Sequence, residues 1–327
     1  MPAMHEHDEA TDDHDATDHQ HTTEDQHGTE HTHEHADDGR PRIAFIGAGR
    51  VGTALGMAFA RAGWQVTAVA SRDEDRRRGF QERVAGARAF ADSHPVLDEA
   101  DLIFLTVPDD AIAGAAEELQ LYSGQALVHT SGAVPASVLT PAMAAGTSIG
   151  SFHPLVSFAQ LDQAVADLRG ATIAIEGDAS LLPLLAELAE SIGAQPVTLP
   201  EGGKSAYHAA AMMAAGGVIG LFDAIAQVAV LAGLDERTAV AVYAPLARQA
   251  LANAERLGID QALTGPLLRG DVGTVRGHLE ILRALAPETL PLYVAVARRE
   301  LEIARRRGDL EPDRAAQIES LLDRSSG

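Results

Sequence analysis

The residues whose types are best suited to catalysis lie close together after Pro200. The only lysine of the chain, Lys204, is followed four residues later by His208, and the other 24 cations are arginines. An ammonium group gives up and recovers a proton, whereas a guanidinium stays protonated. Residues four apart share one face of a helix, and Tyr207 lies beside that face. We predict Lys204 and His208 as catalytic and Tyr207 as substrate-binding. A solvated lysine and a buried helix–helix histidine are the alternatives.

Two loops carry further candidates for substrate binding. His153 precedes a proline after an apolar stretch, which favours an extended backbone that presents the imidazole. Thr264 and Arg269 lie in a glycine- and proline-containing loop between two expected helices, and a guanidinium suits a substrate carboxylate. The alternative for Arg269 is a surface pair with Asp271.

A glycine motif indicates a bound dinucleotide. The apolar stretch 43–46 leads into Gly47, Ala48, Gly49, Arg50, Val51 and Gly52, and a helical pattern follows over 53–62. Such glycines permit a tight turn and a close approach of the backbone to a pyrophosphate at a helix N-terminus. The context of strand, glycine turn and helix favours this over a glycine-rich turn without a ligand.

The end of the next strand bears on which dinucleotide binds. Ser71 and Arg72 stand about 20 residues beyond the glycines, where NAD enzymes place an acid. A guanidinium there suits the 2′-phosphate of NADP, and Arg76–Arg78 lie nearby. We predict NADP. The alternatives are NAD, with Asp73 in the acid position, and a deazaflavin.

Two more strand ends are expected to border the cofactor, because ligands of open α/β sheets bind beyond the carboxyl ends of the strands. These positions are Thr106, Val107, Pro108 and Ser131, and Gly132 suits a sharp turn close to the cofactor. His129, just before Ser131, is expected to be a hydrogen-bonded core histidine.

The order of patterns predicts the fold class. Short apolar segments alternate with amphipathic helices, as in a doubly wound parallel sheet. The predicted strands are 42–46, 65–70, 102–107, 126–129, 147–152, 172–176 and 195–198. After Pro200 the sequence predicts helices only, over 203–232, 235–256, 271–286 and 288–307. We expect an N-terminal Rossmann domain over 40–200 and an all-α domain over 201–327.

Composition limits the remaining possibilities. Residues 1–39 contain thirteen acids, nine histidines and no Lys or Arg, which predicts a disordered tail with at most loose divalent-metal binding. The rest has 34 acids against 25 bases, which argues against nucleic-acid binding. Cysteine is absent, and no apolar run is expected to span a membrane. We expect a cytoplasmic protein without a metal site in its folded part.

Four stretches together resemble a known group of proteins. They are GAGRVG at 47–52, FHPL at 152–155, KSAYHAAA at 204–211 and ALTGPLLRGD at 262–271. This combination resembles Rossmann-like proteins with an uncharacterised helical C-terminal domain, related to pyrroline-carboxylate reductase, ketopantoate reductase and the β-hydroxyacid dehydrogenases. The resemblance implies a C-terminal domain of the 6-phosphogluconate dehydrogenase type, NADP-linked reduction and a homodimer. It places Lys204 at the catalytic lysine of the hydroxyacid enzymes, while His208 replaces their asparagine.

The sequence therefore predicts an NADP-dependent oxidoreductase that transfers hydride to a small carboxylate-bearing carbonyl compound, such as a 2-oxo acid. The alternatives are an imine reductase of the pyrroline-carboxylate type, a non-catalytic NADP-binding sensor, and a metal-handling protein that works through its N-terminal tail.

Overall fold

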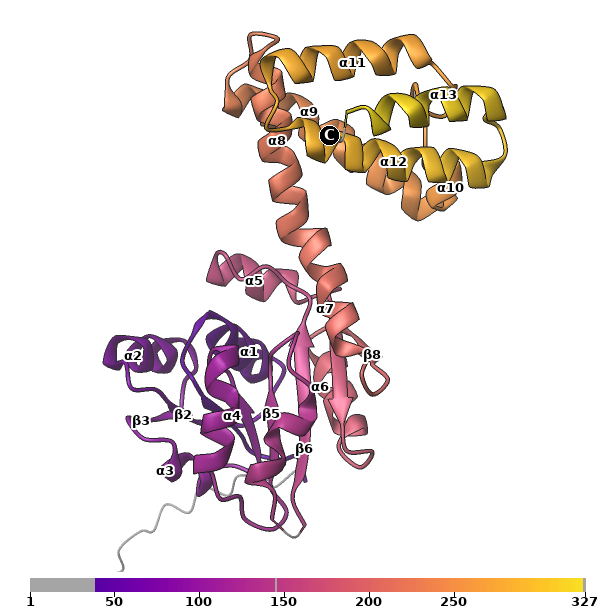
Figure 1. The fold of residues 1–327 in the computed structure, drawn as a ribbon. Helices are drawn as coiled ribbons and strands as arrows, with labels where there is room; N and C mark the ends of the chain where they lie inside the picture. Colours follow the sequence, from indigo (N-terminus) through magenta and orange to yellow (C-terminus); the bar gives the residue numbers. More distant parts are fainter. Residues whose placement is uncertain (1–38, 145, 326–327) are drawn as a thin grey trace, which may run out of the picture. The chain divides into compact units, whose positions relative to one another are not determined.

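An eight-stranded sheet forms the N-terminal part of the computed structural model, which describes residues 39–144 and 146–325 (Figure 1). The strand order is β3-β2-β1-β4-β5-β6-β7-β8. Its strands are β1 (Ile43–Ile46), β2 (Val66–Ala70), β3 (Arg88–Phe90), β4 (Leu102–Leu105), β5 (Ala126–His129), β6 (Ser148–Pro154), β7 (Thr172–Gly177) and β8 (Gln195–Thr198). The first six strands in this order run parallel, so their carboxyl ends share one edge.

The Rossmann fold is confirmed, with two differences in the sheet. All seven predicted strands are present, and β3 is an additional strand of three partly exposed residues, too short for a periodic signal. The sheet is not parallel throughout, because β7 pairs antiparallel with β6 and β8 runs parallel to β7. An apolar run shows that a strand is buried but does not encode the direction in which it pairs.

Helices cover both faces of the sheet, as a doubly wound fold requires. On one face Phe45 and Phe104 pack against α1 (Arg50–Arg61), α2 (Glu74–Arg83) and α6 (Leu182–Ser191). On the other face Ile103 and Leu127 pack against α3 (His94–Leu97), α4 (Asp109–Glu118) and the 3-10 segment η1 (Ala136–Ala142). A further helix, α5 (Leu161–Asp167), packs against α1. Both sheet faces are buried, which explains why the strands read as continuous apolar runs.

The C-terminal part is helical, as predicted. Its elements are α7 (Lys204–Met212), the π-helical segment η2 (Met213–Gly217), α8 (Val218–Val230), α9 (Glu236–Leu257), α10 (Ile259–Ala262), α11 (Val272–Leu285), α12 (Leu290–Arg307) and α13 (Pro312–Asp323). Aspartates start two of the predicted helices, since Asp235 caps α9 and Asp271 caps α11 through their side chains. The short α10 and the C-terminal α13 were not predicted, and the apolar residues of α13 join the core formed by α11 and α12.

One expectation about membranes needs correction. The segments α7, η2 and α8 form one continuous helix, Lys204–Val230, which is long and apolar enough to cross a membrane by length and composition alone (Figure 1). This helix was not predicted as a candidate membrane span, because Lys204, His208 and Asp223 interrupt the apolar run. The predicted disorder and loose metal binding of the histidine-rich tail concern residues that, apart from Gly39, lie outside the described part of the chain.

Candidate functional site

The glycine motif forms a turn between β1 and α1 whose shape depends on Thr106. Gly47 has a φ of +109°, and a Cβ there would lie 2.5 Å from the Thr106 carbonyl oxygen. A Cβ on Gly52 would lie 2.5 Å from both the Gly47 carbonyl oxygen and Thr106 Oγ1. The Thr106 hydroxyl donates a hydrogen bond of 2.6 Å to the Gly47 carbonyl. The first and third glycines are therefore required by the protein itself.

Gly49 differs from its two neighbours in the motif. A Cβ at this position would come no closer than 4.0 Å to another atom, so nothing in the described chain requires a glycine there. Gly49 also precedes the first residue of α1, where free backbone N–H groups attract anions. This open backbone fits the close approach of a pyrophosphate.

A cavity of about 410 Å³ adjoins the glycine turn. It is lined by Ala48, Gly49, Arg50, Thr53, Arg76, Gly79, Arg83 and Leu161. Three of these residues are arginines, from the start of α1 and from α2, so the cavity suits an anionic ligand. Arg50 also donates to the Ala159 carbonyl at 3.2 Å, which orients its side chain.

The tip of β2 has one guanidinium without a bound partner among the described residues. Arg76 pairs with Asp73 at 3.2 Å, and the Asp73 carboxylate also caps the start of α2. Arg77 donates to the Ser71 carbonyl, and Arg78 pairs with Asp75. Arg72 is exposed and makes no hydrogen bond or ion pair in the described structure. The acid that would bind an NAD ribose is thus engaged by its own helix.

The β5 strand end is organised around a buried histidine. His129 is fully buried, Ser131 N donates to its Nδ1 at 3.2 Å, and its Nε2 lies 3.3 Å from the Pro135 carbonyl. Burial, together with the positive charge of Lys204, lowers the pKa of His129 to about 3. The prediction of a hydrogen-bonded core histidine is confirmed. The Ser131 hydroxyl accepts from two following backbone N–H groups and shapes the loop.

Two imidazoles and a phenol gather beside Gly132. A Cβ on Gly132 would lie 2.4 Å from His208 Nδ1 and 2.6 Å from His153 Nε2, so only glycine leaves room for both rings. The His153 ring lies 6.1 Å from the Tyr207 ring and 5.8 Å from the His208 ring. Two of the polar atoms here, Tyr207 Oη and His208 Nδ1, are buried without a hydrogen-bond partner among the described residues. Unpaired buried polar atoms are costly, and a polar ligand would satisfy them.

Lys204 lies directly behind this group. Its side chain is 3% exposed, its Nζ donates to the Ser151 hydroxyl, and Nζ lies 3.6 Å from Glu176 Oε2. Burial lowers the pKa of Lys204 to about 8, although Glu176 opposes this effect. The predicted site residues Lys204, Tyr207, His208 and His153 are therefore brought together, with Lys204 enclosed by protein groups.

Thr264 and Arg269 lie in the loop between α10 and α11, and both are exposed. No hydrogen bond, ion pair or ring contact within the described residues joins them to the histidine group. Their substrate-binding role stays a prediction. The alternative pair of Arg269 with Asp271 is not formed as a close ion pair, since Asp271 caps α11 through Thr274 N instead.

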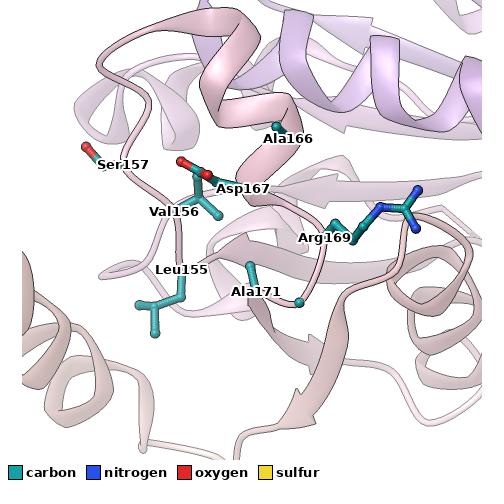
Figure 2. A pocket seen from close by; sticks show the side chains of 8 residues that line it. Leu155, Val156, Ser157, Ala166, Asp167, Arg169 and Ala171 are labelled. Atoms are coloured by element: carbon teal, nitrogen blue, oxygen red, sulfur yellow. The ribbon is translucent and has the colours of Figure 1, made fainter. Parts of the chain in front are cut away.

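A second cavity in the sheet domain, of about 440 Å³, lies beside the connection from β6 to α5 and from α5 to β7 (Figure 2). Figure 2 shows the side chains of its two charged residues, Asp167 and Arg169, pointing in different directions. No convergent set of polar groups lines it, so we do not regard it as the functional site.

Three residues that the structure places at the site were not predicted as site residues. They are Arg83, Ser151 and Glu176. Gly132, in contrast, was expected to form a sharp turn close to the cofactor, because it follows the predicted strand end at Ser131. Ser151 and Glu176 become neighbours through the β6–β7 pairing, which a single sequence does not reveal.

Two family models match the chain. Residues 28–154 match a Rossmann-like domain, and residues 171–300 match a domain of unknown function, DUF2520. None of the curated proteins compared with the sequence matches it.

Solved structures share the fold over most of the chain. A protein from Thermotoga maritima is 27% identical, with a TM-score of 0.65, and the match covers 80% of this chain and 98% of that one. An imine reductase from a Pseudomonas species is 16% identical, with a TM-score of 0.61 and coverages of 86% and 99%. A pyrroline carboxylate reductase from Plasmodium falciparum, with NADP bound, is 11% identical, with a TM-score of 0.56 and coverages of 87% and 97%. The chain thus carries a Rossmann-like domain and a DUF2520 domain, on a fold that it shares with pyrroline carboxylate reductases and imine reductases.

Proposed function

We propose that this protein is an NADP-dependent reductase of a small carbonyl or imine compound. The observation that carries the proposal is the group of buried, unpaired polar atoms beside Gly132, at the same edge of the sheet as the open glycine turn. Ligands of open α/β sheets bind at this edge. The similar fold of reductases, one of which holds NADP, supports the same assignment.

The residues of the cofactor site fit NADP. The open backbone at Gly49 suits the pyrophosphate, and Arg72 suits the 2′-phosphate because its guanidinium has no partner in the described chain. Asp73 is occupied as a helix cap, which weakens the case for NAD. When bound, NADPH supplies the hydride. The protein has to orient the acceptor carbon, exclude water and manage the accompanying proton.

His153 has a defined role in hydrogen bonding. Its Nδ1 lies 3.0 Å from the Thr130 carbonyl, which only accepts, so Nδ1 carries the proton. Burial, with the charges of Lys204 and His208, lowers the pKa of His153 and favours the neutral ring. The other nitrogen, Nε2, is then an acceptor. It suits a substrate N–H or O–H group and does not suit a carboxylate.

This property favours the second candidate function, reduction of a C=N bond. A protonated imine carries an N–H group that His153 Nε2 accepts, whereas a carbonyl oxygen needs a donor. Tyr207 is the donor available for the carbonyl reaction, because burial raises its pKa and keeps its hydroxyl protonated. In either reaction the substrate carboxylate is left to other groups, and Arg269 remains our candidate for it.

We propose that Lys204 acts by charge and position, and that the groups facing the substrate are Tyr207, His208 and His153. The Nζ atom of Lys204 is held by Ser151 and Glu176 and is not open to a ligand in this arrangement. Its charge favours the neutral form of the neighbouring histidines.

We also propose a cytoplasmic homodimer formed through the helical part. A groove of about 410 Å³ lies between α8, α9, α11 and α12, and its rim includes Leu221, Ile281, Leu292 and Val296, which are 37–49% exposed. The helix Lys204–Val230 is also largely uncovered, with Met213 75% and Ile219 71% exposed. Apolar surface of this extent marks an interaction site, and a second copy would cover both surfaces.

The glycine turn gives a matched test of cofactor binding. We expect Gly49→Ala to leave the melting temperature unchanged but to weaken NADPH binding at least about tenfold, because the new methyl group occupies the ligand's approach. Gly52→Ala should instead destabilise the fold by roughly 1–3 kcal/mol through its clash with Thr106. Fluorescence titration with NADPH and thermal unfolding measure both effects. Unchanged NADPH affinity in Gly49→Ala would argue against a dinucleotide at this turn.

Cofactor preference should depend on Arg72. We expect Arg72→Ala to weaken NADPH binding roughly tenfold to a hundredfold, as expected from the loss of a charge-assisted hydrogen bond, and to leave NADH binding unchanged. Arg78→Ala is the control, since Arg78 already pairs with Asp75 and Glu82. Titrations with both cofactors decide the question. Equal losses for NADPH and NADH would show that Arg72 does not bind the 2′-phosphate.

The reaction is tested by following NADPH oxidation with 2-oxo acids and cyclic imino acids. For an imine substrate, we expect His153→Ala to lower kcat/KM roughly tenfold to a hundredfold, and Tyr207→Phe to have a smaller effect. For a carbonyl substrate, we expect Tyr207→Phe to lower kcat/KM more than His153→Ala does. Tyr122→Phe is the control because Tyr122 is 54% exposed. Tight NADPH binding without turnover on either class would favour the sensor instead.

The homodimer is tested by analytical ultracentrifugation. We expect the wild type to sediment as two chains, and the double variant Ile281→Glu with Leu292→Glu to sediment as one, because carboxylates in the groove prevent its burial. Met143→Glu, on a residue that is 41% exposed in the sheet domain, is the control. A monomeric wild type, or one that partitions into lipid vesicles, would contradict the proposal.

A further inference from the structure

The helix that carries Tyr207 and His208, α7, contacts the sheet domain through a charged side chain. Among the nine residues of α7, only Lys204 is buried, while Ser205, Ala206, Ala209 and Ala210 are exposed. The N-cap residue Gly203 provides no side-chain hydrogen bond. Helices normally dock through an apolar face, whereas the first turn of α7 docks through a charged side chain.

The surface beneath Lys204 is a row of polar residues across three strands. In the sheet register His129 of β5 pairs with Ser151 of β6, and Ser151 pairs with Glu176 of β7. Paired residues present their side chains on the same face. Lys204 Nζ donates to Ser151 and lies 3.6 Å from Glu176 Oε2, so it spans the last two members of the row.

The spacing along the helix matches the spacing along β6. From Ser151 to His153 the strand advances two residues, about 6.6 Å, and both side chains lie on one face. From Lys204 to His208 the helix advances four residues, about 6 Å. A contact of Lys204 with Ser151 therefore places His208 next to His153, as the ring distance of 5.8 Å shows.

We propose that Ser151 and Glu176 are positioning residues, which hold the Lys204 ammonium and thereby fix the register of α7 against β6. In that register Tyr207 and His208 meet His153 over Gly132. The inference rests on the proposed function for its catalytic consequence, but the anchoring of α7 is a property of the fold alone.

The positive charge of Lys204 explains why the row of polar residues includes the carboxylate of Glu176. An ammonium buried without a counter-ion would lose its proton, and Glu176 supplies the nearest negative charge. The other ionisable groups that act on Lys204 are Asp109, which favours its charged form, and His129 and His153, whose neutral forms Lys204 favours. The anchor therefore depends on Lys204 remaining protonated.

The proposal is tested on the full chain with Glu176→Gln, Ser151→Ala, Lys204→Met and the double variant Lys204→Met with Glu176→Leu. Hydrogen exchange of α7 peptides reports the anchoring, and kcat across the neutral and alkaline pH range reports its consequence. NADPH affinity and melting temperature show whether each variant is folded. The matched controls are Glu190→Gln on α6 and Ser205→Ala on α7, both at exposed positions.

We expect Glu176→Gln and Ser151→Ala to raise exchange in α7 and to lower kcat on the order of tenfold to a hundredfold, with NADPH affinity unchanged. The alkaline fall of kcat should move to lower pH in Glu176→Gln, because loss of the carboxylate lowers the pKa of Lys204 further. Compared with Lys204→Met, the double variant should show slower hydrogen exchange in α7 and a higher kcat, since an apolar pair can replace a buried ion pair.

Two results would overturn the proposal. The first is that Glu176→Gln and Ser151→Ala show the same hydrogen exchange in α7 and the same kcat as the control variants. The other is a double variant with a protected α7 that stays as inactive as Lys204→Met, because the lysine would then act on the substrate itself. A wild type without turnover on any substrate would refute the proposed function, yet the exchange measurements would still decide whether the anchor exists.

Discussion

A buried ammonium group governs the geometry of the candidate site. Lys204 takes its place because two neighbouring strands offer a hydroxyl and a carboxylate at adjacent positions, Ser151 and Glu176. In this fold that pairing arises from the antiparallel register of β6 and β7. The departure from an all-parallel sheet is thus part of how the site is built, since another register would leave the ammonium without a counter-ion.

A second constraint of the same kind acts at the glycine turn. Thr106, at the end of β4, lies against Gly47 and Gly52, and its hydroxyl bonds the Gly47 carbonyl. The two glycines serve this contact between neighbouring strand ends, while Gly49 leaves the backbone open to a ligand. The turn thus separates the residues that shape it from the one that is left open to the proposed cofactor, which suits rigid recognition of a phosphate.

The helical part contributes surface as well as a core. Its inner residues from α11, α12 and α13 form a continuous apolar cluster, but α8 and α9 bury little beyond Ala226, Ala229 and Ala239. Small buried residues permit close helix contacts, and several larger apolar side chains on these two helices, including Ile219, Leu246 and Leu251, are exposed. This exposed apolar surface is the basis of the homodimer proposed above.

The sequence by itself determined the Rossmann sheet, the glycine turn, the helical second half and the grouping of Lys204, Tyr207 and His208. These features depend on local periods and spacings: apolar runs, glycines at fixed offsets and residues four apart on a helix. Tertiary structure alone decided the direction of β7 and β8, the place of Gly132 between two imidazoles, and the pairing of Lys204 with Ser151 and Glu176. The lysine that looks exposed and reactive in the sequence is enclosed in the fold, because its burial and charge compensation depend on Ser151 and Glu176, which lie far from it along the chain.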